Sequence, residues 1–414
     1  MSVLGIEFGS TRIKGVLIDE NRRVMQSGVH DWENRMEDGY WTYSLDEVWA
    51  GVKDVVSQID TSDVTAVGIS AMMHGYLAFD KSGELLTPFR TWRNTNTEIA
   101  AAKLTELFNF NIPLRWSVAH LYQAILDGEE HVKDIDYITT LAGYVHWKLT
   151  GERVLGIGDA SGMFPIEEGG YNVKFVRQFE ELTGIDWTKI APKVLKGGAY
   201  AGTCRGIPFC PPEGDAETGM VATNSIAPCT GSVSAGTSIF AMVVLEKPLD
   251  KLHREIDIVT TPTGDDVAMI HCNECTVKID PWINLFWEAF SLMGLDCAKS
   301  DLFSKLYEVS LDDGKLAQFM REILESAVSD LADGIKILTE QEKVTITSLA
   351  GHGGFFKSGS AGQTIMSKTL NIPVTISETA AEGGAWGIAL LAEYLKCSKE
   401  RSLQKFLSEV MKNV

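Results

Sequence analysis

The sequence has no long hydrophobic run and little positive charge. No stretch approaches the roughly 18 uninterrupted apolar residues of a membrane span, and the N-terminus lacks the basic start and apolar run of a signal peptide. Lys and Arg number 37 against 56 Asp and Glu, which gives a formal net charge of −19. Nucleic acids and anionic membranes both need a basic surface, so neither is an expected partner. We expect a cytoplasmic protein.

The spacing of the cysteines matches neither a disulfide framework nor a zinc site. The seven cysteines stand at irregular spacings, as reduced thiols do. Cys272 and Cys275 form a CxxC beside His271, but no second pair of ligands follows at zinc spacing. With 414 residues the chain is long enough for two or three domains, and two is the economical expectation.

The first polar motif lies between two short apolar runs near the N-terminus. Alternating apolar residues on both sides predict a β-hairpin over residues 3–19, with Gly9, Ser10 and Thr11 at its tip. Gly9 lets a ligand approach the backbone, Ser10 and Thr11 offer hydroxyl groups, and Lys14 offers a charge to a phosphate. Glu7 could face a metal ion. Alone, such a hairpin is more often an ordinary turn.

Strand and helix patterns alternate along the rest of the chain. Strands are expected at 64–70, 240–245, 267–271, 344–349 and 374–376, and helices at 46–59, 98–108, 118–126, 137–149, 173–183, 281–293, 316–338 and 382–395. Three prolines within 208–212 mark a hinge. Each half opens with strands around a glycine turn and closes with helices, which predicts two α/β domains enclosing a cleft, over 1–212 and 213–414.

Three glycine turns stand in a fixed order, at residues 9–11, 236–238 and 351–354. Together they resemble the phosphate-1, phosphate-2 and adenosine motifs of the actin-like (ribonuclease H-like) ATPase superfamily, and within it the FGGY family of carbohydrate kinases. The resemblance implies a set of nucleotide contacts. They are Ser10, Thr11, Lys14, Gly236, Thr237, Ser238, Gly353, Gly354 and Phe355.

Four further segments narrow the resemblance. SAMMHG at 70–75 and FRTWRN at 89–94 are similar to the sugar-contacting segments of xylulokinases, which implies that Met73, His74 and Trp92 bind substrate. Trp116 and His120 are weaker candidates for the same role. EGDAETG at 213–219 resembles the loop of the catalytic base, and GGAWGIALLA at 383–392 the closing helix. Taken as single residues, His74 and Trp92 would be ordinary core side chains.

The resemblance implies an ATP-dependent sugar kinase that phosphorylates a ketose, and the expected acceptor is a pentulose such as xylulose. Phosphoryl transfer needs a base for the acceptor hydroxyl and positive charge on the transferring group. Asp215 fits the base and a substrate contact, although an Asp in that position could simply cap a helix. Mg²⁺ is expected near Glu7 and Asp215, bridging ATP phosphates through water. ATP and a small sugar are the implied partners, and a homodimer is an open option.

The chain departs from the family in three places. Glu7 replaces the usual Asp, Ala216 replaces an Asn, and a loop carried by relatives is shortened to 309–314. Two other functions therefore stay open at this point. One is a non-kinase actin-like ATPase that switches conformation, and the other is a catalytically silent sugar-binding relative.

Overall fold

The computed structural model describes residues 2–236, 238–272, 274–356, 359–376 and 383–412. The chain forms two compact units. Unit 1 comprises residues 1–224, 257–266 and 382–414, and unit 2 comprises 225–256 and 267–381. These units differ from the predicted ranges 1–212 and 213–414, chiefly because the C-terminal residues belong to the unit that holds the N-terminus.

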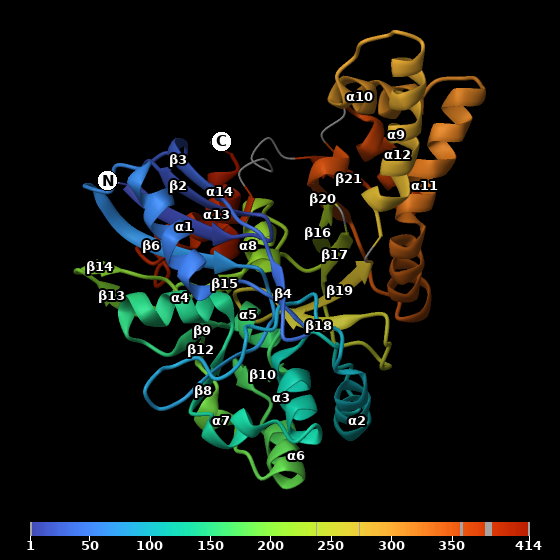
Figure 1. Cartoon of the computed structure of the whole chain (residues 1–414). Helices are drawn as coiled ribbons and strands as arrows, with labels where there is room; N and C mark the ends of the chain where they lie inside the picture. The colour runs from blue at the N-terminus through green and yellow to red at the C-terminus, as the bar shows by residue number, and fades with distance from the viewer. Residues whose placement is uncertain (1, 237, 273, 357–358, 377–382, 413–414) are drawn as a thin grey trace. The chain divides into compact units, whose positions relative to one another are not determined.

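Unit 1 is organised around a five-stranded sheet (Figure 1). Its strands, in spatial order, are β15 (Glu213–Gly214), β6 (Val64–Ala71), β1 (Ser2–Phe8), β2 (Arg12–Ile18) and β3 (Val24–Asp31). The predicted hairpin is confirmed, because β1 and β2 pair antiparallel from Val3 opposite Ile18 to Phe8 opposite Ile13. Strands β1, β6 and β15 run parallel, so their carboxyl ends meet at one edge.

Helices cover both faces of this sheet, and glycines allow them to come close. A Cβ on Gly5 would lie 2.0 Å from the Ala385 carbonyl of α13 (Gly383–Tyr394), and one on Gly15 would lie 2.5 Å from Val55 of α1 (Leu45–Ser57). Gly5 pairs with Val16, the neighbour of Gly15, and successive residues of a strand point to opposite faces. Helices α13 and α1 therefore lie on opposite faces.

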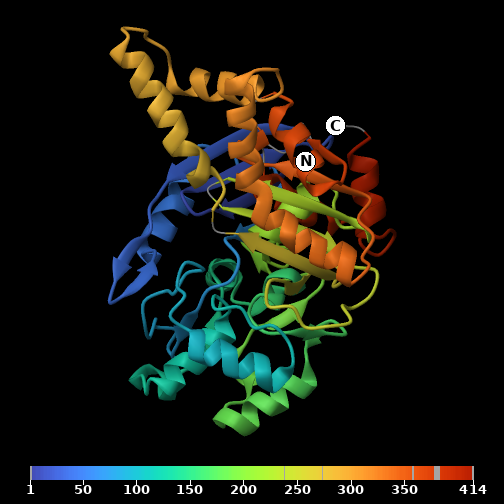
Figure 2. The ribbon, with the colours of Figure 1, turned by 90° about the vertical axis from the view of Figure 1, so that its right-hand side faces the viewer.

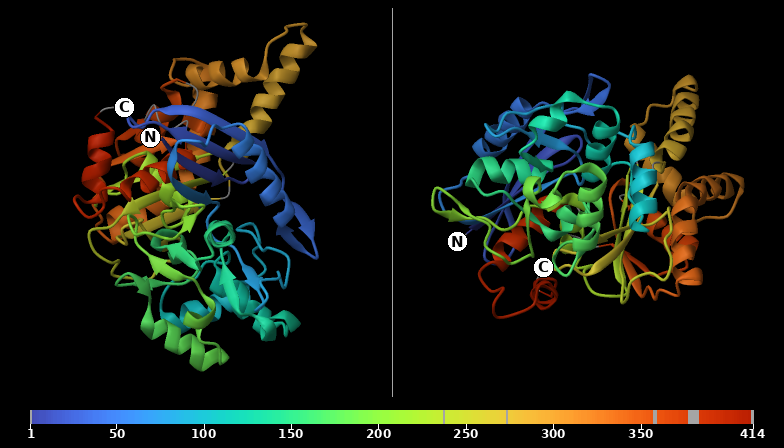
Figure 3. Two further views of the ribbon diagram at one scale, coloured as in Figure 1. Left: turned by 90° about the vertical axis from the view of Figure 1, so that its left-hand side faces the viewer. Right: turned by 90° about the horizontal axis from the view of Figure 1, so that it is seen from below.

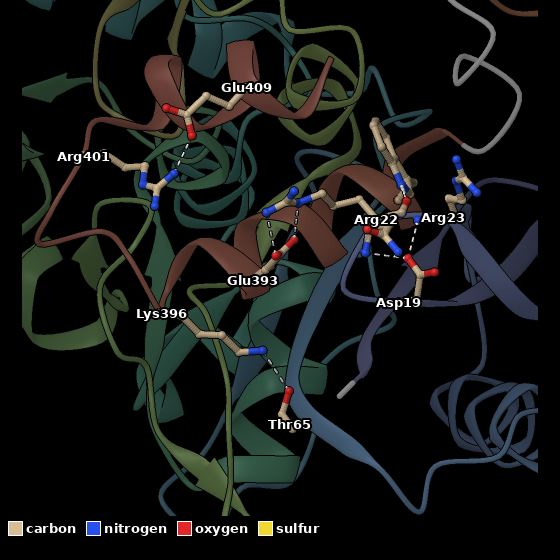
Figure 4. Close-up of polar contacts among 10 residues, drawn as sticks. Asp19, Arg22, Arg23, Thr65, Glu393, Lys396, Arg401 and Glu409 are labelled. Carbon is tan, nitrogen blue, oxygen red and sulfur yellow. Dashed lines mark hydrogen bonds and ion pairs between the residues drawn. The ribbon is translucent and has the colours of Figure 1, made fainter. Parts of the chain in front are cut away.

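Helix α13 and the residues just after it are tied to the sheet and its turns by polar contacts (Figure 4). The guanidinium of Arg22, in the turn after β2, donates to both carboxylate oxygens of Glu393 at 3.1 Å. The indole of Trp386 donates to the Arg22 carbonyl at 2.8 Å, and Lys396 donates to the Thr65 hydroxyl at 3.0 Å. These contacts, with the close glycine packing, place the end of the chain in unit 1.

Unit 1 also contains short strands, several of them paired in two-stranded sheets, and further helices, which two other views show in Figure 3. They are β4 (Arg35–Glu37), β5 (Tyr40–Thr42), β7 (Leu77–Phe79), α2 (Glu98–Phe108), α3 (Ser117–Leu126), η1 (Glu130–Asp134), β8 (Tyr137–Thr139), α4 (Leu141–Thr150), β9 (Val154–Gly156), α5 (Ile157–Ser161), β10 (Ile166–Glu167), β11 (Gly170–Tyr171), α6 (Val173–Thr183), α7 (Trp187–Ile190), β12 (Lys193–Leu195), β13 (Thr203–Cys204), β14 (Ile207–Pro208), α8 (Asp215–Ala222), β18 (Asp257–Thr260) and α14 (Leu403–Val410).

One predicted helix of this unit was wrong in its first turn. The expected helix at 137–149 begins as strand β8, paired with β7, and α4 starts only at Leu141. The Thr140 hydroxyl caps α4 by accepting the Gly143 N–H at 3.2 Å. The residues before the cap, Tyr137 to Thr139, are aromatic or β-branched types that suit a strand, so the cap fixes the boundary.

Unit 2 combines a sheet with four helices. Side by side lie β19 (Asp266–Cys272), β17 (Ile239–Val244), β16 (Thr230–Ala235), β20 (Ser348–His352) and β21 (Val374–Ile376). The helices are α9 (Thr276–Leu292), α10 (Lys299–Val309), α11 (Lys315–Lys336) and α12 (Ala361–Leu370), with η2 (Ile337–Gln341) and η3 (Gly354–Phe356). Strand β20 begins four residues later than the predicted 344–349. In the part of the chain that the structure describes, no helix has the length and apolar composition needed to cross a bilayer.

Candidate active site

Three parallel strands of unit 1 bring distant polar residues into one row. Glu7 of β1 lies beside Ser70 of β6, and Ser70 lies beside Glu213 of β15. Each strand ends one residue further on and leads directly into a predicted functional segment. Those segments are the Gly9 turn, the Met73–His74 segment and Asp215 at the start of α8. Strand pairing therefore gathers parts of the candidate site that are more than 200 residues apart in sequence.

Asp215 is held at the first position of α8. Its Oδ1 accepts the Met73 N–H at 3.0 Å, which joins the predicted base to the predicted sugar-binding segment. Burial raises the pKa of Asp215 to about 6, while the Met73 and Ala216 N–H groups oppose that rise. A carboxylate with this pKa is mostly ionised at neutral pH and can still accept a proton, as a general base must.

Glu7 lies close enough to Asp215 for the two charges to interact. Burial and the Asp215 charge raise the pKa of Glu7 to about 7, against the Ala385 N–H and the Lys14 charge. The Ala385 N–H donates to Glu7 Oε2 at 3.1 Å, so the start of α13 orients the carboxylate. Lys14 stands opposite Glu7 on β2.

The Glu7 and Asp215 carboxylates fit a magnesium ion that also binds phosphates. Burial raises the pKa of both carboxyl groups, and the Asp215 charge raises that of Glu7 further, an effect that a divalent cation would relieve. Among the described residues no group of three or more His, Cys, Asp or Glu side chains is arranged to hold a metal ion. Mg²⁺ commonly uses one or two carboxylates, with water and substrate phosphates as its other ligands.

A second group of carboxyl groups lies deeper, and the sequence prediction did not assign it a role. Asp159, Glu213 and Glu217 are fully buried. The Asp159 N–H donates to Glu213 Oε2 at 2.9 Å, and the Thr140 hydroxyl donates to Asp159 Oδ2 at 2.6 Å. Burial, the largest cause, raises the pKa of Asp159 and of Glu213 to about 8, and that of Glu217 well above its ordinary value.

The Glu217 side chain packs closely against the backbone of glycines near the predicted base, Asp215. A Cβ on Gly158 would lie 2.4 Å from Glu217 Cγ, and one on Gly214 would lie 2.4 Å from Glu217 Oε2. Neither carboxyl oxygen of Glu217 has a hydrogen-bond partner among the described residues. In the sequence Asp159 stands among small residues, in GIGDASG, and this composition does not reveal its burial.

His74 has a strained backbone in the predicted sugar segment. Its φ is +69°, and Gly75 follows with φ +104°, so two successive residues are left-handed. This conformation costs a non-glycine residue about 1–2 kcal/mol, and such strain concentrates at functional sites. His74 is buried, and its Nδ1 lies 3.2 Å from the Gly162 carbonyl. If Nδ1 donates there, Nε2 is the ring's acceptor.

Trp116, which precedes α3, and His120 of α3 lie near the same segment. Trp116 stacks beside His74 at 6.5 Å between ring centroids, and the His120 ring lies 6.2 Å from Tyr76. Trp116 Nε1 and both His120 nitrogens are buried without a hydrogen-bond partner among the described residues. Burial, followed by the Arg90 charge, lowers the pKa of His120 to about 3, so the ring is neutral. Trp92 is half-buried and packs against the main core.

The first glycine turn is fixed by bonds to its carbonyls. The Trp32 indole donates to the Gly9 carbonyl at 2.8 Å, and the Tyr43 hydroxyl donates to the Ser10 carbonyl at 2.6 Å. The Gly9 N–H donates to the Arg12 carbonyl at 2.9 Å. With its carbonyls held by aromatic side chains, the turn is rigid, as a phosphate-binding turn should be.

The other two glycine turns meet within unit 2. Strands β16 and β20 pair parallel, with Ser234 beside His352, so the turns that follow them lie at the same edge of the sheet. Gly353 has φ +100°, and a Cβ there would lie 2.5 Å from the Ala235 carbonyl. Gly354 has open space around it. Two glycine turns that are far apart in the sequence therefore lie close together in unit 2.

The predicted nucleotide residues of unit 2 differ in their surroundings. The Gly236 N–H donates to the Ser238 carbonyl at 2.9 Å, which closes the turn. Thr237 lies outside the described residues. The Phe355 ring is fully buried and contacts Tyr307 and Phe356, so it anchors the loop to the core of its unit. Contact of Phe355 with adenine stays a prediction.

Two α/β units with glycine turns at strand ends are the architecture of the actin-like sugar kinases. Comparison with known families gives the same class. Residues 2–235 match the N-terminal domain of the FGGY family of carbohydrate kinases, and residues 304–395 match its C-terminal domain. The chain belongs to the FGGY family. The predicted family and two-domain actin-like fold are confirmed, and so, at the level of the family, is the class of ATP-dependent sugar kinase.

The names of the similar proteins refer to different substrates. A xylulose kinase from Staphylococcus xylosus is 21% identical over 223 residues, 48% of this chain and 44% of its own length. A glycerol kinase from Saccharolobus islandicus (strain M.16.27) is 23% identical over 458 aligned positions, 94% of this chain and 87% of its own. The chain thus spans less than half of the first relative and most of the second.

Two solved structures share the fold. A xyloylose kinase from Brucella ovis superposes with a TM-score of 0.81 at 17% identity, covering 98% of this chain and 92% of its own. The Plasmodium falciparum glycerol kinase with ADP gives a TM-score of 0.80 at 14% identity, covering 99% and 92%. At these identities the likeness describes the fold alone.

Proposed function

We propose that this protein transfers the γ-phosphoryl group of ATP to a hydroxyl of a ketose, with a pentulose such as xylulose as the acceptor. The observation that carries the proposal is the direct hydrogen bond between Asp215 and Met73 at the ends of neighbouring strands. That bond joins the base to the sugar segment. Unit 1 would hold the sugar and the base, and unit 2 would hold the nucleotide.

In the proposed reaction Asp215 accepts the proton of the acceptor hydroxyl. The hydroxyl oxygen forms a bond to the γ-phosphorus while the bond to the β-phosphate oxygen breaks, which releases ADP. Asp215 is suited to this step because its pKa of about 6 leaves it ionised at neutral pH. Mg²⁺ held by Glu7 and Asp215 would neutralise phosphate charge.

The sugar site would be formed by His74, by Trp116 just before α3 and by His120 of α3. A sugar carries a ring of hydroxyl groups that each donate and accept hydrogen bonds. The buried, unpaired nitrogens of Trp116 and His120 are groups that such hydroxyls would satisfy. Met73 and Trp92 would supply apolar surface. Ser10, Thr11 and Lys14 would contact phosphates in unit 1, and Gly236, Thr237, Ser238, Gly353 and Gly354 would do so, or approach adenosine, in unit 2.

The test is ADP release from the full chain with ATP and Mg²⁺ across a panel of pentuloses, hexuloses and polyols. Strong stimulation by one ketose supports the proposal and identifies the substrate. Stimulation by glycerol alone would replace the ketose with a polyol, in keeping with the glycerol kinase relatives. A flat panel would contradict kinase activity and favour an ATPase switch or a silent sugar-binding protein.

A further inference from the structure

The segment from Trp32 to Tyr43, between β3 and α1, contacts both the first glycine turn and the predicted sugar segment. It contains the short hairpin of β4 and β5, which Figure 2 shows in blue together with the strands that precede it in the chain. This segment has no role in the proposed reaction. Its contacts nevertheless join two parts of the candidate site within unit 1.

The two ends of the segment hold all three carbonyl groups of the first glycine turn. The Trp32 indole donates to the Gly9 carbonyl at 2.8 Å, and the Trp32 N–H donates to the Thr11 carbonyl at 3.2 Å. The Tyr43 hydroxyl donates to the Ser10 carbonyl at 2.6 Å, and burial raises its pKa, so it remains a donor. A carbonyl oxygen repels a phosphate, so a phosphate-binding turn must direct its carbonyl groups away from the ligand.

The Tyr43 ring extends this contact toward the predicted sugar segment. It stacks with Trp32 at 4.2 Å between ring centroids, and its centroid lies 6.4 Å from that of Phe89. Phe89 in turn packs against the left-handed Gly75 next to His74, because a Cβ on Gly75 would lie 2.7 Å from the Phe89 ring. All three rings are buried, so none can move without displacing its neighbours.

Further contacts hold the segment against residues 89–94. The Asn94 side chain accepts the Trp41 N–H and donates to the Trp41 carbonyl, both at 2.8 Å. The Arg93 guanidinium lies 4.0 Å from the centroid of the Trp41 ring, within the range of a cation–π interaction. With Trp41 fixed in this way, Tyr43 is held in place only two residues further along the chain.

We propose that Tyr43 is a positioning residue for phosphoryl transfer, whose hydroxyl group and ring fix the phosphate-binding turn and the sugar segment relative to one another. The inference rests on the proposed function, in which the Gly9 turn binds phosphate and the His74 segment binds sugar. Transfer requires the acceptor hydroxyl to lie in line with the γ-phosphate, and a misplacement of about 1 Å can cost about 100-fold in rate. Tyr43 acts through Ser10 and Phe89, and not by touching a substrate.

Two substitutions in the full chain separate the hydroxyl group from the ring. Tyr43→Phe removes the bond to the Ser10 carbonyl and keeps the stacked ring, so kcat for ADP release should fall about 10–100-fold while the KM for the sugar stays the same. Tyr43→Leu removes both contacts. The KM for the sugar should then also rise about 2–10-fold, the effect of weakening one hydrogen bond between His74 and the sugar.

Tyr144→Phe is the matched control. Tyr144 is a buried tyrosine of the same core, and its hydroxyl also makes one hydrogen bond, accepting the Trp49 indole N–H at 3.0 Å. Its kinetic constants should match the wild type, although a hydrogen bond is lost in both Phe variants. A kcat for Tyr43→Phe equal to that of Tyr144→Phe overturns the proposal.

Hydrogen exchange of the chain without substrates tests the same contacts independently of activity. Exchange should become faster in peptides covering residues 8–12 in Tyr43→Phe, and in those covering 73–76 as well in Tyr43→Leu, because local opening limits exchange. A flat acceptor panel with the wild type would refute the proposed function, whereas this comparison would still decide whether Tyr43 fixes the two segments. Unchanged exchange at residues 8–12 in either variant overturns the proposal, as does unchanged exchange at 73–76 in a folded Tyr43→Leu variant. If thermal melting shows that the Leu variant is unfolded, the Phe variant decides through kcat and exchange at 8–12.

Discussion

Replacing Asp215 by Asn tests the proposed base with little change in size. An Asn oxygen still accepts the Met73 N–H, so the contact between α8 and the sugar segment is retained. The amide does not take up a proton at neutral pH. A positioned base is worth about 10²–10⁴-fold in rate, so kcat with the stimulating sugar should fall at least ~100-fold. The KM for the sugar should change much less.

The pKa of Asp215 also predicts how wild-type activity depends on pH. With a pKa of about 6, the ionised fraction is about nine-tenths at pH 7 and about one-tenth at pH 5. The value of kcat/KM should therefore fall about tenfold between these two pH values, and level off above pH 7. In the Asn variant this part of the profile should disappear, because the titrating group is gone.

The assay is coupled ADP release at saturating ATP and Mg²⁺, measured across this pH range. Asp80→Asn is a suitable control, since Asp80 lies in the exposed turn after β7 and its carboxylate bonds only within that turn. Its rate should match the wild type. Near-normal turnover in the Asp215 variant, or the same pH profile in both proteins, would refute the assignment of Asp215 as the base.

Three further substitutions test buried or closely packed positions within the two units. Glu217→Gln should raise the free energy of unfolding by ~1–3 kcal/mol at about pH 8 and change it little at about pH 5. The reason is that burial raises the pKa of Glu217 in the folded protein, so the wild type loses stability as the pH rises. Gly384→Ala puts a Cβ 2.5 Å from Glu7 Oε1 and should lower kcat about 10–100-fold. Gly353→Ala should destabilise unit 2 by about 1–3 kcal/mol, since it combines a left-handed φ with a backbone clash, whereas Gly354→Ala should not.

Each of these substitutions has a direct measurement. Thermal unfolding across pH tests Glu217→Gln. The same pH dependence of stability in the wild type and the variant would contradict the raised pKa of the buried Glu217 carboxyl group. For Gly384→Ala the readout is ADP release, with Gly170→Ala as a control at a position where a Cβ meets nothing within 4 Å. Calorimetry compares the two variants at 353 and 354, and equal unfolding temperatures would argue against the close turn.

Local pattern was enough to predict much of the secondary structure. Helix α6 at 173–183 and helix α2 at 98–108 were predicted at their observed bounds, because their apolar spacing and end residues act within a few turns. The first hairpin was predicted for the same reason. The start of α4 was not, since a strand that pairs with β7 took residues 137–139 out of the expected helix.

The site could be predicted only in part. Glu7, Asp215 and His74 were identifiable because the ordered motifs resemble one family, and the structure brings their segments together at adjacent strand ends. The buried acids Glu213 and Glu217 were missed as a group. Burial raises their pKa values, and the segment of α5 that packs against them, around Gly158 and Asp159, is distant in the sequence, so no local pattern records that burial.

The sequence by itself determined the family, the order of the glycine turns and the acidic charge of this protein, since these are properties of residue type and spacing. The tertiary structure alone decided that α13 joins unit 1, that Asp215 receives the Met73 N–H, and that the second half of α9 remains exposed. Each of these depends on contacts between residues far apart in the chain. Parallel strand pairing and burial arise only when those distant segments pack, so they have no signature in any short stretch.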